Sequence, residues 1–337
     1  MQPIINFPLK EHNTFGIDAY AKQYISITSE KQLATILKEK QASDFFILGG
    51  GSNMLLTKNI EALVLHINIK GIKIIKEDDD FAWIESKAGE NWHEFVLYSI
   101  KHDFGGLENL SLIPGNVGTT PIQNIGAYGA EIKDTLIHCD AIEITSGKMV
   151  RFSNLDCNFG YRESIFKKEQ KGNYIITAVT FKLSKKNHKI NIDYGDIKKE
   201  LEQLGIAIPS IKQISDAVTS IRKSKLPDPK ELGNCGSFFK NPIIPKNQYQ
   251  LIQKVFPNMP SYDLGTDLVK VPAGWLIENA GFKGKRYGDA GVHINQALVI
   301  VNYGDATGNE LLQLSKKIQK TVFKKYKIGI EAEVNIL

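Results

Sequence analysis

The spacing of apolar residues along the first 68 residues predicts strands that alternate with one helix. Alternating apolar residues predict a strand over 24–27, and short apolar runs predict strands over 45–48 and 63–67. Between the first two, Leu33, Ile36 and Leu37 recur at helical spacing, and Ser29 with Gln32 forms a helix-start signal. This stretch is therefore expected to fold in the order β-α-β.

Strand patterns become dense after residue 70. They cover GIKIIK, FAWIES and YIITAVTFKL, and AIEIT and MVRF are expected to form a hairpin across SGK. Among them, Asn91 and Glu94 are expected to open a helix that carries Trp92, Phe95 and Val96 on its apolar side. Residues up to about 210 are thus expected to form an α+β unit of two lobes.

Periodicity breaks once, after residue 225. A helix is expected over 211–225, LPDPKELGNCG then forms an irregular connection, and residues 238–337 form a smaller α+β region. That region ends with a long helix opened by a capping box of Thr307 and Glu310, and with a last strand over 330–336. The predicted division is 1–68 and 69–210 for the two lobes, 211–325 for a second domain, and 326–337 for a closing strand.

Composition narrows the class of protein. The chain has 337 residues, of which 42% are hydrophobic and 23% charged, with a net charge of +5, as in ordinary globular domains. No apolar run reaches the roughly 18 residues of a membrane helix, and the N-terminus lacks the pattern of a secretory signal. Three widely spaced cysteines fit reduced thiols in the cytoplasm. The lysines of the terminal helix fall on its polar side, so nucleic-acid binding is not expected.

Two glycine-rich loops are candidates for ligand binding. LGGGSNML (48–55) follows a predicted strand and can offer backbone N–H groups to an anion, although it matches neither the dinucleotide fingerprint nor the P-loop. The run IPGNVGTTPIQNIGAYGAE (113–131) is long and nearly uncharged. It is either a surface loop or a loop that wraps a polyphosphate-bearing ligand, and its length favours binding.

Two shorter segments carry candidate chemistry. In FGYRESIF, Arg162 fits either a half-buried ion pair or a contact with an anionic ligand. GNCGSFFKNP places a thiol at Cys235 and a hydroxyl at Ser237 between glycines, which fits either a reactive site or a tight turn beside a core. The histidines show no metal-ligand spacing and no GxSxG motif occurs, so neither a metal site nor a serine hydrolase is expected.

Seven segments occur in an order that resembles one known family. They are NTFGI, ILGGGSNML, GLENLSLIPGNVGTTPIQNIGAYG, FGYRESIF, KLPDPK, GNCGSFFKNP and AGWLIENAG. The chain resembles the UDP-N-acetylenolpyruvoylglucosamine reductases, the MurB flavoenzymes of bacterial cell-wall synthesis, from about residue 12 to Glu333. The resemblance implies an α+β FAD-binding fold of the vanillyl-alcohol oxidase (PCMH) type in two lobes, followed by a smaller α+β substrate-binding domain.

The resemblance also implies a reaction and a set of residues. NADPH would reduce bound FAD, which then reduces the enolpyruvyl ether of UDP-N-acetylglucosamine to UDP-N-acetylmuramate. Arg162 matches the family's active-site arginine, Ser237 its proton donor and Glu333 its C-terminal glutamate. The positions that match flavin contacts are Gly49, Gly50, Gly51, Ser52, Asn53, Pro114, Gly115, Gly118, Thr119, Gln123, Asn124, Gly126, Ala127 and Tyr128. The positions that match substrate contacts are Tyr194, which marks the longer subtype, Arg222, Lys225, Asn241 and Gln296.

The chain departs from the family pattern at two places. Position 235 is Cys where a small residue, usually alanine, is expected, and the C-terminal block reads EAEVN where EPEVR is commoner. Two other functions stay open: an FAD enzyme of the same superfamily with another substrate, and a nucleotide- or nucleic-acid-binding protein that uses its basic helices without catalysis. We expect a cytoplasmic monomer that associates with neither nucleic acid nor a membrane.

Overall fold

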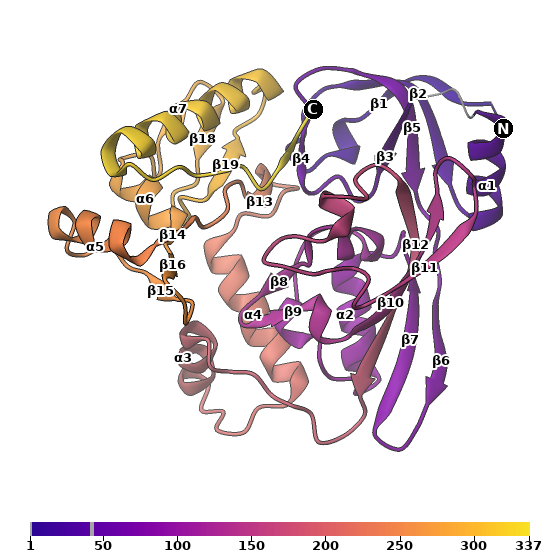
Figure 1. Ribbon diagram of the computed structural model, residues 1–337, viewed down its shortest axis with the longest axis horizontal. Helices are drawn as coiled ribbons and strands as arrows, with labels where there is room; N and C mark the ends of the chain where they lie inside the picture. Colours follow the sequence, from indigo (N-terminus) through magenta and orange to yellow (C-terminus); the bar gives the residue numbers. More distant parts are fainter. Residues whose placement is uncertain (1, 41–43) are drawn as a thin grey trace. The chain divides into compact units, whose positions relative to one another are not determined.

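The computed structural model describes residues 2–40 and 44–337, which group into two compact units (Figure 1). Unit 1 consists of residues 1–7, 21–50 and 60–222, and unit 2 of residues 8–20, 51–59 and 223–337. Unit 2 therefore combines two short N-terminal segments with the C-terminal third of the chain. The four-part division expected from the sequence stays a prediction.

The first sheet of unit 1 contains the predicted β-α-β element. Its strands lie in the order β1 (Ile4–Pro8), β2 (Tyr20–Ile27), β5 (Ile60–Ile67) and β3 (Phe45–Leu48). Strands β2, β5 and β3 are parallel, as a helical crossover allows. The crossover helix α1 (Glu30–Glu39) begins after Ser29, whose hydroxyl accepts a hydrogen bond from the backbone N–H of Gln32. Leu33, Ile36 and Leu37 are buried against the sheet, which confirms the predicted helix face.

The second sheet of unit 1 is antiparallel. Its order is β11 (Met149–Ser153), β10 (Leu136–Glu143), β12 (Tyr174–Ser184), β7 (Phe81–Lys87) and β6 (Ile72–Glu77), and β10 with β11 forms the predicted hairpin. Helix α2 (Trp92–Lys101) begins after Asn91, whose side chain accepts from the backbone N–H of Glu94. Trp92, Phe95 and Phe181 pack together with ring centroids 5.2–6.0 Å apart, and they belong to one hydrophobic core of unit 1.

Short elements and two further helices complete unit 1, except that residues 223–225 at the end of the second helix belong to unit 2. Helix α4 (Ile211–Lys225) buries Ile214, Val218 and Ile221 against α3 (Gly195–Gln203), as its apolar stripe predicts. The core also brings together two cysteines that are distant in the sequence, Cys139 and Cys157, with their sulfur atoms 3.9 Å apart. The short elements are η2 (Glu108–Leu110), η3 (Val117–Thr119), η4 (Pro121–Gln123), β8 (Gly126–Ala127), β9 (Ala130–Glu131), η5 (Ile132–Asp134) and η6 (Ile165–Lys167).

Unit 2 is built from small sheets and three helices. Its main sheet has the order β13 (Gly233–Ser237), β19 (Val299–Asn302), β18 (Ala290–Val292) and β17 (Arg286–Tyr287). A second sheet has the order β14 (Ile243–Pro245), β16 (Leu268–Lys270) and β15 (Tyr262–Asp263), and β4 (Met54–Leu55) pairs with β20 (Asn335–Ile336). The other elements are η1 (Lys10–His12), α5 (Lys246–Val255), α6 (Ala273–Asn279) and α7 (Gly308–Tyr326).

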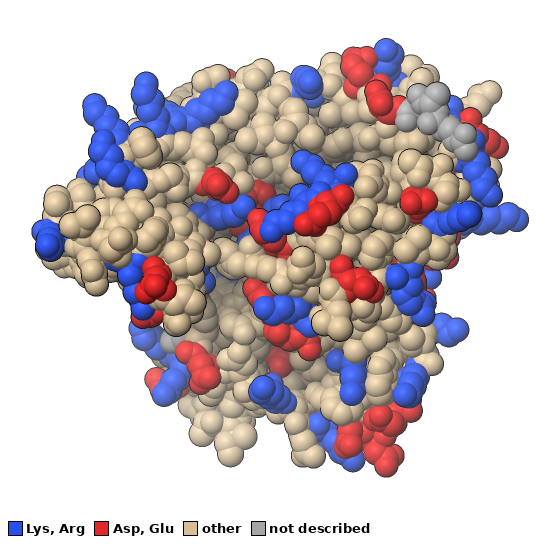
Figure 2. Space-filling view, viewed as in Figure 1, with Lys and Arg blue, Asp and Glu red and all other residues tan. Residues whose placement is uncertain are grey.

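Helix α7 confirms its predicted start and its predicted apolar face. The Thr307 hydroxyl accepts from the backbone N–H of Glu310, and the Glu310 carboxylate accepts from the backbone N–H of Thr307. One side of the helix is buried, whereas its lysines lie mainly on the exposed side. Figure 2 shows basic side chains gathered in the region where Figure 1 places this helix. Among the helices of the described ranges, none has the length and apolar character needed to cross a membrane.

The predicted strand over 330–336 is wrong as a continuous element. Only Asn335–Ile336 forms a strand, and Ala332 forms an isolated bridge with Phe239. The reason is that the segment divides its backbone hydrogen bonds between two neighbours: Glu333 N–H donates to Phe238, whereas Asn335 N–H donates to Asn53. Ile336 is consequently exposed, although Ile330 and Val334 are buried.

Candidate active site

In unit 1, Gly49 and Gly50 of the first glycine-rich loop meet the second glycine-rich loop, both of which are predicted to bind a cofactor. A Cβ atom on Gly50 would lie 2.9 Å from the Cα of Gly115, and one on Gly49 would lie 2.5 Å from the Thr119 methyl group. Gly118 packs equally closely against Ala88. Glycine is therefore required here for the close approach of the loops. Among the hydrogen bonds of residues 2–40 and 44–337, none is donated by the backbone N–H groups of Gly49 and Gly50.

The long loop 113–131 has more structure of its own than its sequence predicts. It contains two 3₁₀ turns and the β8–β9 hairpin, and its predicted cofactor positions Pro114, Gln123, Ala127 and Tyr128 all belong to unit 1. Asn124 lies in the left-handed region, with φ of 44°, and is fully buried. Its side-chain amide donates to Glu131 Oε2 at 3.0 Å and to Gly160 O at 3.1 Å, and its oxygen accepts from Lys133 N–H at 3.2 Å.

Arg162 lies at the tip of a tight turn that contacts this loop. Gly160 and Glu163 exchange backbone hydrogen bonds of 3.0 and 3.2 Å, so Tyr161 and Arg162 are the two central residues of the turn. Arg162 has φ of 56°, a conformation that costs a non-glycine residue about 1 kcal/mol or more. Its guanidinium donates to the carbonyl of Gly126 at 2.6 Å.

Three further predicted site residues accompany Arg162 in unit 1. Arg222 is partly buried and its Nε–H donates to the carbonyl of Leu112 at 3.2 Å. Burial and the nearby positive charge of Arg162 lower the pKa of Arg222, whereas a hydrogen bond with Tyr128 opposes this effect. The rings of Tyr128 and Tyr194 meet edge to face at 5.5 Å, with Tyr194 half exposed. Two neighbouring arginines beside two tyrosines form a favourable place for an anionic, ring-bearing ligand.

In unit 2, GNCGSFFKNP forms a bulged strand rather than a turn. Asn234 pairs with Val301 and Ser237 with Val299, so Cys235 and Gly236 are accommodated in a bulge, and Gly236 has φ of 72°. Cys235 is 7% exposed, and burial and then the charge of Glu333 raise the pKa of its thiol well above the ordinary value. Ser237, in contrast, is exposed. The bulge thus presents the hydroxyl and buries the thiol.

Glu333 lies in the segment that pairs with the residues following Ser237. The Glu333 N–H donates to the carbonyl of Phe238 at 2.8 Å, and Lys240 N–H donates to Glu331 at 3.0 Å. The carbonyl of Glu333 also accepts from the side chain of Asn53 at 3.5 Å. Unit 2 therefore brings the predicted proton donor and the predicted glutamate close to Asn53, one of the predicted flavin contacts, together with its neighbours Gly51 and Ser52.

The remaining predicted substrate residues, also in unit 2, are held by specific hydrogen bonds. The Asn241 oxygen accepts from the backbone N–H of Ala273 at 2.9 Å, and Gln296 accepts from Leu298 N–H at 3.3 Å. Gln296 also approaches Gly274, so both amides lie beside the start of α6. The backbone of Lys225 receives a hydrogen bond from His293, which sequence reasoning missed because the two residues lie far apart in the chain.

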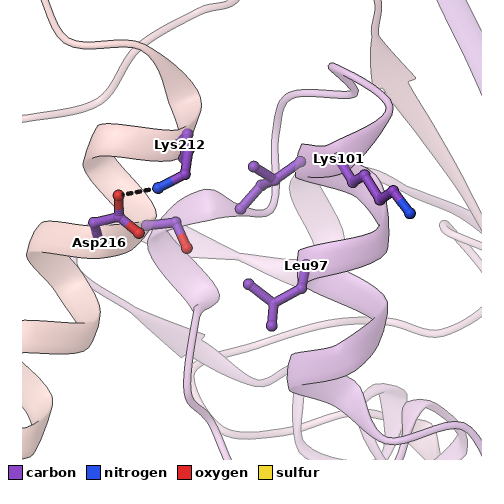
Figure 3. A pocket seen from close by; sticks show the side chains of 6 residues that line it. Leu97, Lys101, Lys212 and Asp216 are labelled. Carbon is purple, nitrogen blue, oxygen red and sulfur yellow. Dashed lines mark hydrogen bonds and ion pairs between the residues drawn. The ribbon is translucent and has the colours of Figure 1, made fainter.

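A separate hollow of unit 1 contains none of these residues. It has a volume of about 510 Å³, lies between α2 and α4, and is lined by residues that include Leu97, Lys101, Lys212 and Asp216. Figure 3 shows that Lys212 and Asp216 of α4 form an ion pair, which satisfies both charges. The hollow is not part of the predicted active site.

Two family models match the chain, and they define it as a flavoprotein. Residues 21–153 match a family model described as an FAD binding domain, and residues 228–337 match the C-terminal domain of UDP-N-acetylenolpyruvoylglucosamine reductase. The reductase of this name from Flavobacterium johnsoniae is 64% identical over 332 residues, covering 98% of both chains. The one from Pseudomonas putida is 44% identical and covers 97% of both chains. The crystal structure of the MurB protein from Thermus caldophilus has a TM-score of 0.67 at 23% identity, covering 99% of this chain and 98% of its own.

The chain belongs to the UDP-N-acetylenolpyruvoylglucosamine reductase family and is an FAD-containing oxidoreductase. The expected α+β FAD-binding fold with a second domain is confirmed. The roles assigned to individual site residues stay predictions, and they divide between the units. Arg162, Tyr194 and Arg222 belong to unit 1, and Lys225, Ser237, Asn241, Gln296 and Glu333 belong to unit 2.

Proposed function

We propose that this protein reduces the enolpyruvyl ether of UDP-N-acetylglucosamine to UDP-N-acetylmuramate, with NADPH as reductant, during synthesis of peptidoglycan precursors. The observation that carries this proposal is the arrangement on the bulge of β13. The serine is exposed, the cysteine is buried, and Glu333 lies in the segment paired beside them. The name of the 64% identical relative, UDP-N-acetylenolpyruvoylglucosamine reductase, supports this substrate.

Gly49, Gly50 and the loop 113–129 would hold FAD through backbone N–H groups, and Asn53 would contribute a side-chain amide. When bound, FAD would supply hydride-transfer chemistry between NADPH and the terminal carbon of the enolpyruvyl group. The amide side chains and backbone groups of the loop 113–129 suit a large polar cofactor without adding charge.

Arg162 would stabilise the negative charge that develops on the substrate. Addition at the terminal carbon leaves electron density on the adjacent carbon and in the carboxylate. The planar guanidinium offers forked donors to a carboxylate, and its hydrogen bond to Gly126 fixes its direction. The positive φ at this residue indicates that the turn is held in place to present the side chain.

Ser237 would then give its proton to that adjacent carbon. A carbanion is basic enough to accept a proton from a neutral hydroxyl, provided that the hydroxyl is correctly positioned. The bulge at Gly236 allows the substrate to approach, and Glu333 would orient or polarise the same end of the substrate. The proton lost by Ser237 is restored from solvent, because this residue is exposed.

The substrate would be bound through its anionic and ring groups. Arg222 and Lys225 would bind its diphosphate or carboxylate, and Tyr194 would pack over a ring of the UDP moiety. Asn241 and Gln296 would offer amide groups beside the start of α6. We also propose that the protein acts as a monomer in the cytoplasm.

A coupled assay tests this function. The purified protein should be yellow and should oxidise NADPH when the enolpyruvyl UDP-sugar is present, with UDP-N-acetylmuramate as the product identified by mass. UDP-N-acetylglucosamine, which lacks the enolpyruvyl group, is the matched control and should give no NADPH oxidation above background. Yellow protein that ignores the enolpyruvyl sugar would indicate a different flavoenzyme, and protein without flavin would contradict the proposal entirely.

A further inference from the structure

The carbonyl group of Gly160 connects the turn that carries Arg162 to Asn124. Gly160 O accepts the backbone N–H of Glu163 at 3.2 Å, which closes the two-residue turn. The same oxygen also accepts the side-chain amide of Asn124 at 3.1 Å. Asn124 therefore holds the base of the turn at whose tip Arg162 lies.

Two other contacts fix the turn to the same stretch of the long loop. The Ser164 hydroxyl donates to the carbonyl of Ile122 at 2.7 Å, and the Arg162 guanidinium donates to the carbonyl of Gly126 at 2.6 Å. Asn124 lies between these attachment points in the sequence. Residues 160–164 and 122–126 thus form one hydrogen-bonded assembly within unit 1.

The Asn124 side chain is used completely in this assembly. Both of its N–H groups have acceptors, Glu131 Oε2 and Gly160 O, and its oxygen accepts from Lys133 N–H. The residue is 0% exposed, and its side chain has no N–H donor left for a cofactor. Glu131 also packs against Gly126, because a Cβ atom on that glycine would lie 2.8 Å from Glu131 Cγ.

We propose that Asn124 is a positioning residue for Arg162 in the substrate-reduction step, and that its side chain does not contact the flavin. Without its amide, the carbonyl of Gly160 loses a partner and the strained turn can relax away from its positive φ. The guanidinium would then be displaced from the direction in which it meets the developing charge. This inference rests on the proposed function, because it assumes that Arg162 stabilises that charge.

The test separates the two half-reactions in Asn124→Ala. Flavin reduction by NADPH is followed first, and reoxidation of the reduced flavin by the enolpyruvyl UDP-sugar is followed without oxygen. Reoxidation should slow by roughly 10- to 100-fold, as expected for a small displacement of a catalytic group, whereas reduction by NADPH should change by less than about twofold. When Arg162→Ala is already present, adding Asn124→Ala should slow flavin reoxidation by less than about twofold more, because the effect of Asn124 acts through the arginine.

Hydrogen exchange gives a second measurement that does not depend on activity. The amide of Glu163 should exchange faster in Asn124→Ala, since its acceptor Gly160 is no longer held. Asn154→Ala is the matched control: its amide also donates to two carbonyls, those of Lys133 and Leu136, at 2.8 Å each. That variant should leave both the exchange of Glu163 and the reoxidation rate unchanged.

The outcomes distinguish the possible failures. If Arg162→Ala reoxidises at the normal rate, the proposed role of the arginine is wrong. If Arg162→Ala is slow but Asn124→Ala is normal, or if their effects multiply, Asn124 does not position Arg162. If Asn124→Ala retains no flavin, Ser164→Ala removes the attachment at Ile122 and carries the same test. It should slow reoxidation selectively by several-fold, and equal slowing of both half-reactions would overturn the proposal.

Discussion

The bulge of β13 allows catalysis and stability to be separated with two neighbouring substitutions. Ser237→Ala removes an exposed hydroxyl, and Cys235→Ala removes a buried sulfur atom two residues away. Both replace a side chain with the same small residue in the same strand. The two variants are therefore controls for each other.

The structure predicts opposite results for the two variants. An exposed residue without a special backbone conformation changes the free energy of unfolding by less than about 0.5 kcal/mol. The loss of a positioned proton donor, in contrast, slows a reaction by roughly 10²- to 10⁴-fold. Removing the sulfur of Cys235, which is 7% exposed, leaves a small cavity and should cost about 1 kcal/mol. Because that thiol is buried, its removal should change the rate of substrate reduction by less than about twofold.

Rapid-mixing kinetics and denaturant unfolding measure these two quantities. In Ser237→Ala, NADPH should reduce the bound flavin at the normal rate, but the reduced flavin should not be reoxidised by the enolpyruvyl sugar. Cys235→Ala should complete both half-reactions and unfold at a lower denaturant concentration. If Cys235→Ala instead blocked substrate reduction while Ser237→Ala retained it, the buried thiol would be the donor and the reasoning from exposure would be refuted.

Three further predictions concern stability and cofactor binding. The contact with Cys157 and burial raise the pKa of Cys139, and burial raises that of Cys235, so the folded protein keeps protons that the unfolded chain releases above about pH 8.5. Below that pH, these thiols should not lower the free energy of unfolding. Above it, the free energy of unfolding should fall by about 1.4 kcal/mol per pH unit for each buried thiol. If Cys235→Ala showed the same fall per pH unit as the unchanged protein, this reasoning would be contradicted. Gly50→Ala should lose flavin, measured as flavin per protein after gel filtration, because its Cβ would lie 2.9 Å from Gly115, whereas Gly329→Ala, with no atom within 4 Å, should retain it. Thr307→Ala should lower the free energy of unfolding by about 1 kcal/mol through loss of the capping box of α7, and no measurable change in denaturant unfolding would show that the cap is dispensable.

Local elements were predictable because their signals are local. The hydroxyl of Ser29 and the amide oxygen of Asn91 open the helices that their positions in the sequence predict, since a helix start needs only a side chain three residues from a backbone N–H. The apolar stripes of α4 and α7 are buried as their spacing predicts. The prediction of a last strand over 330–336 was wrong for a different reason. Alternation of apolar and polar residues predicts an extended segment, but it does not predict whether one neighbouring strand pairs with that segment along its whole length.

The sequence by itself determined the family, the starts of helices α1, α2 and α7, the bounds of α4, and the residue types available for chemistry. The tertiary structure decided how those residues are used. It buries Cys235 and exposes Ser237 through a bulge that depends on pairing with β19, and it brings Cys139 within 3.9 Å of Cys157. It also joins Asn124 to Gly160, at the base of the Arg162 turn, although the two residues are 36 positions apart in the sequence. Such contacts arise from chain segments that meet only after folding, so no periodicity or motif in the sequence can encode their geometry directly.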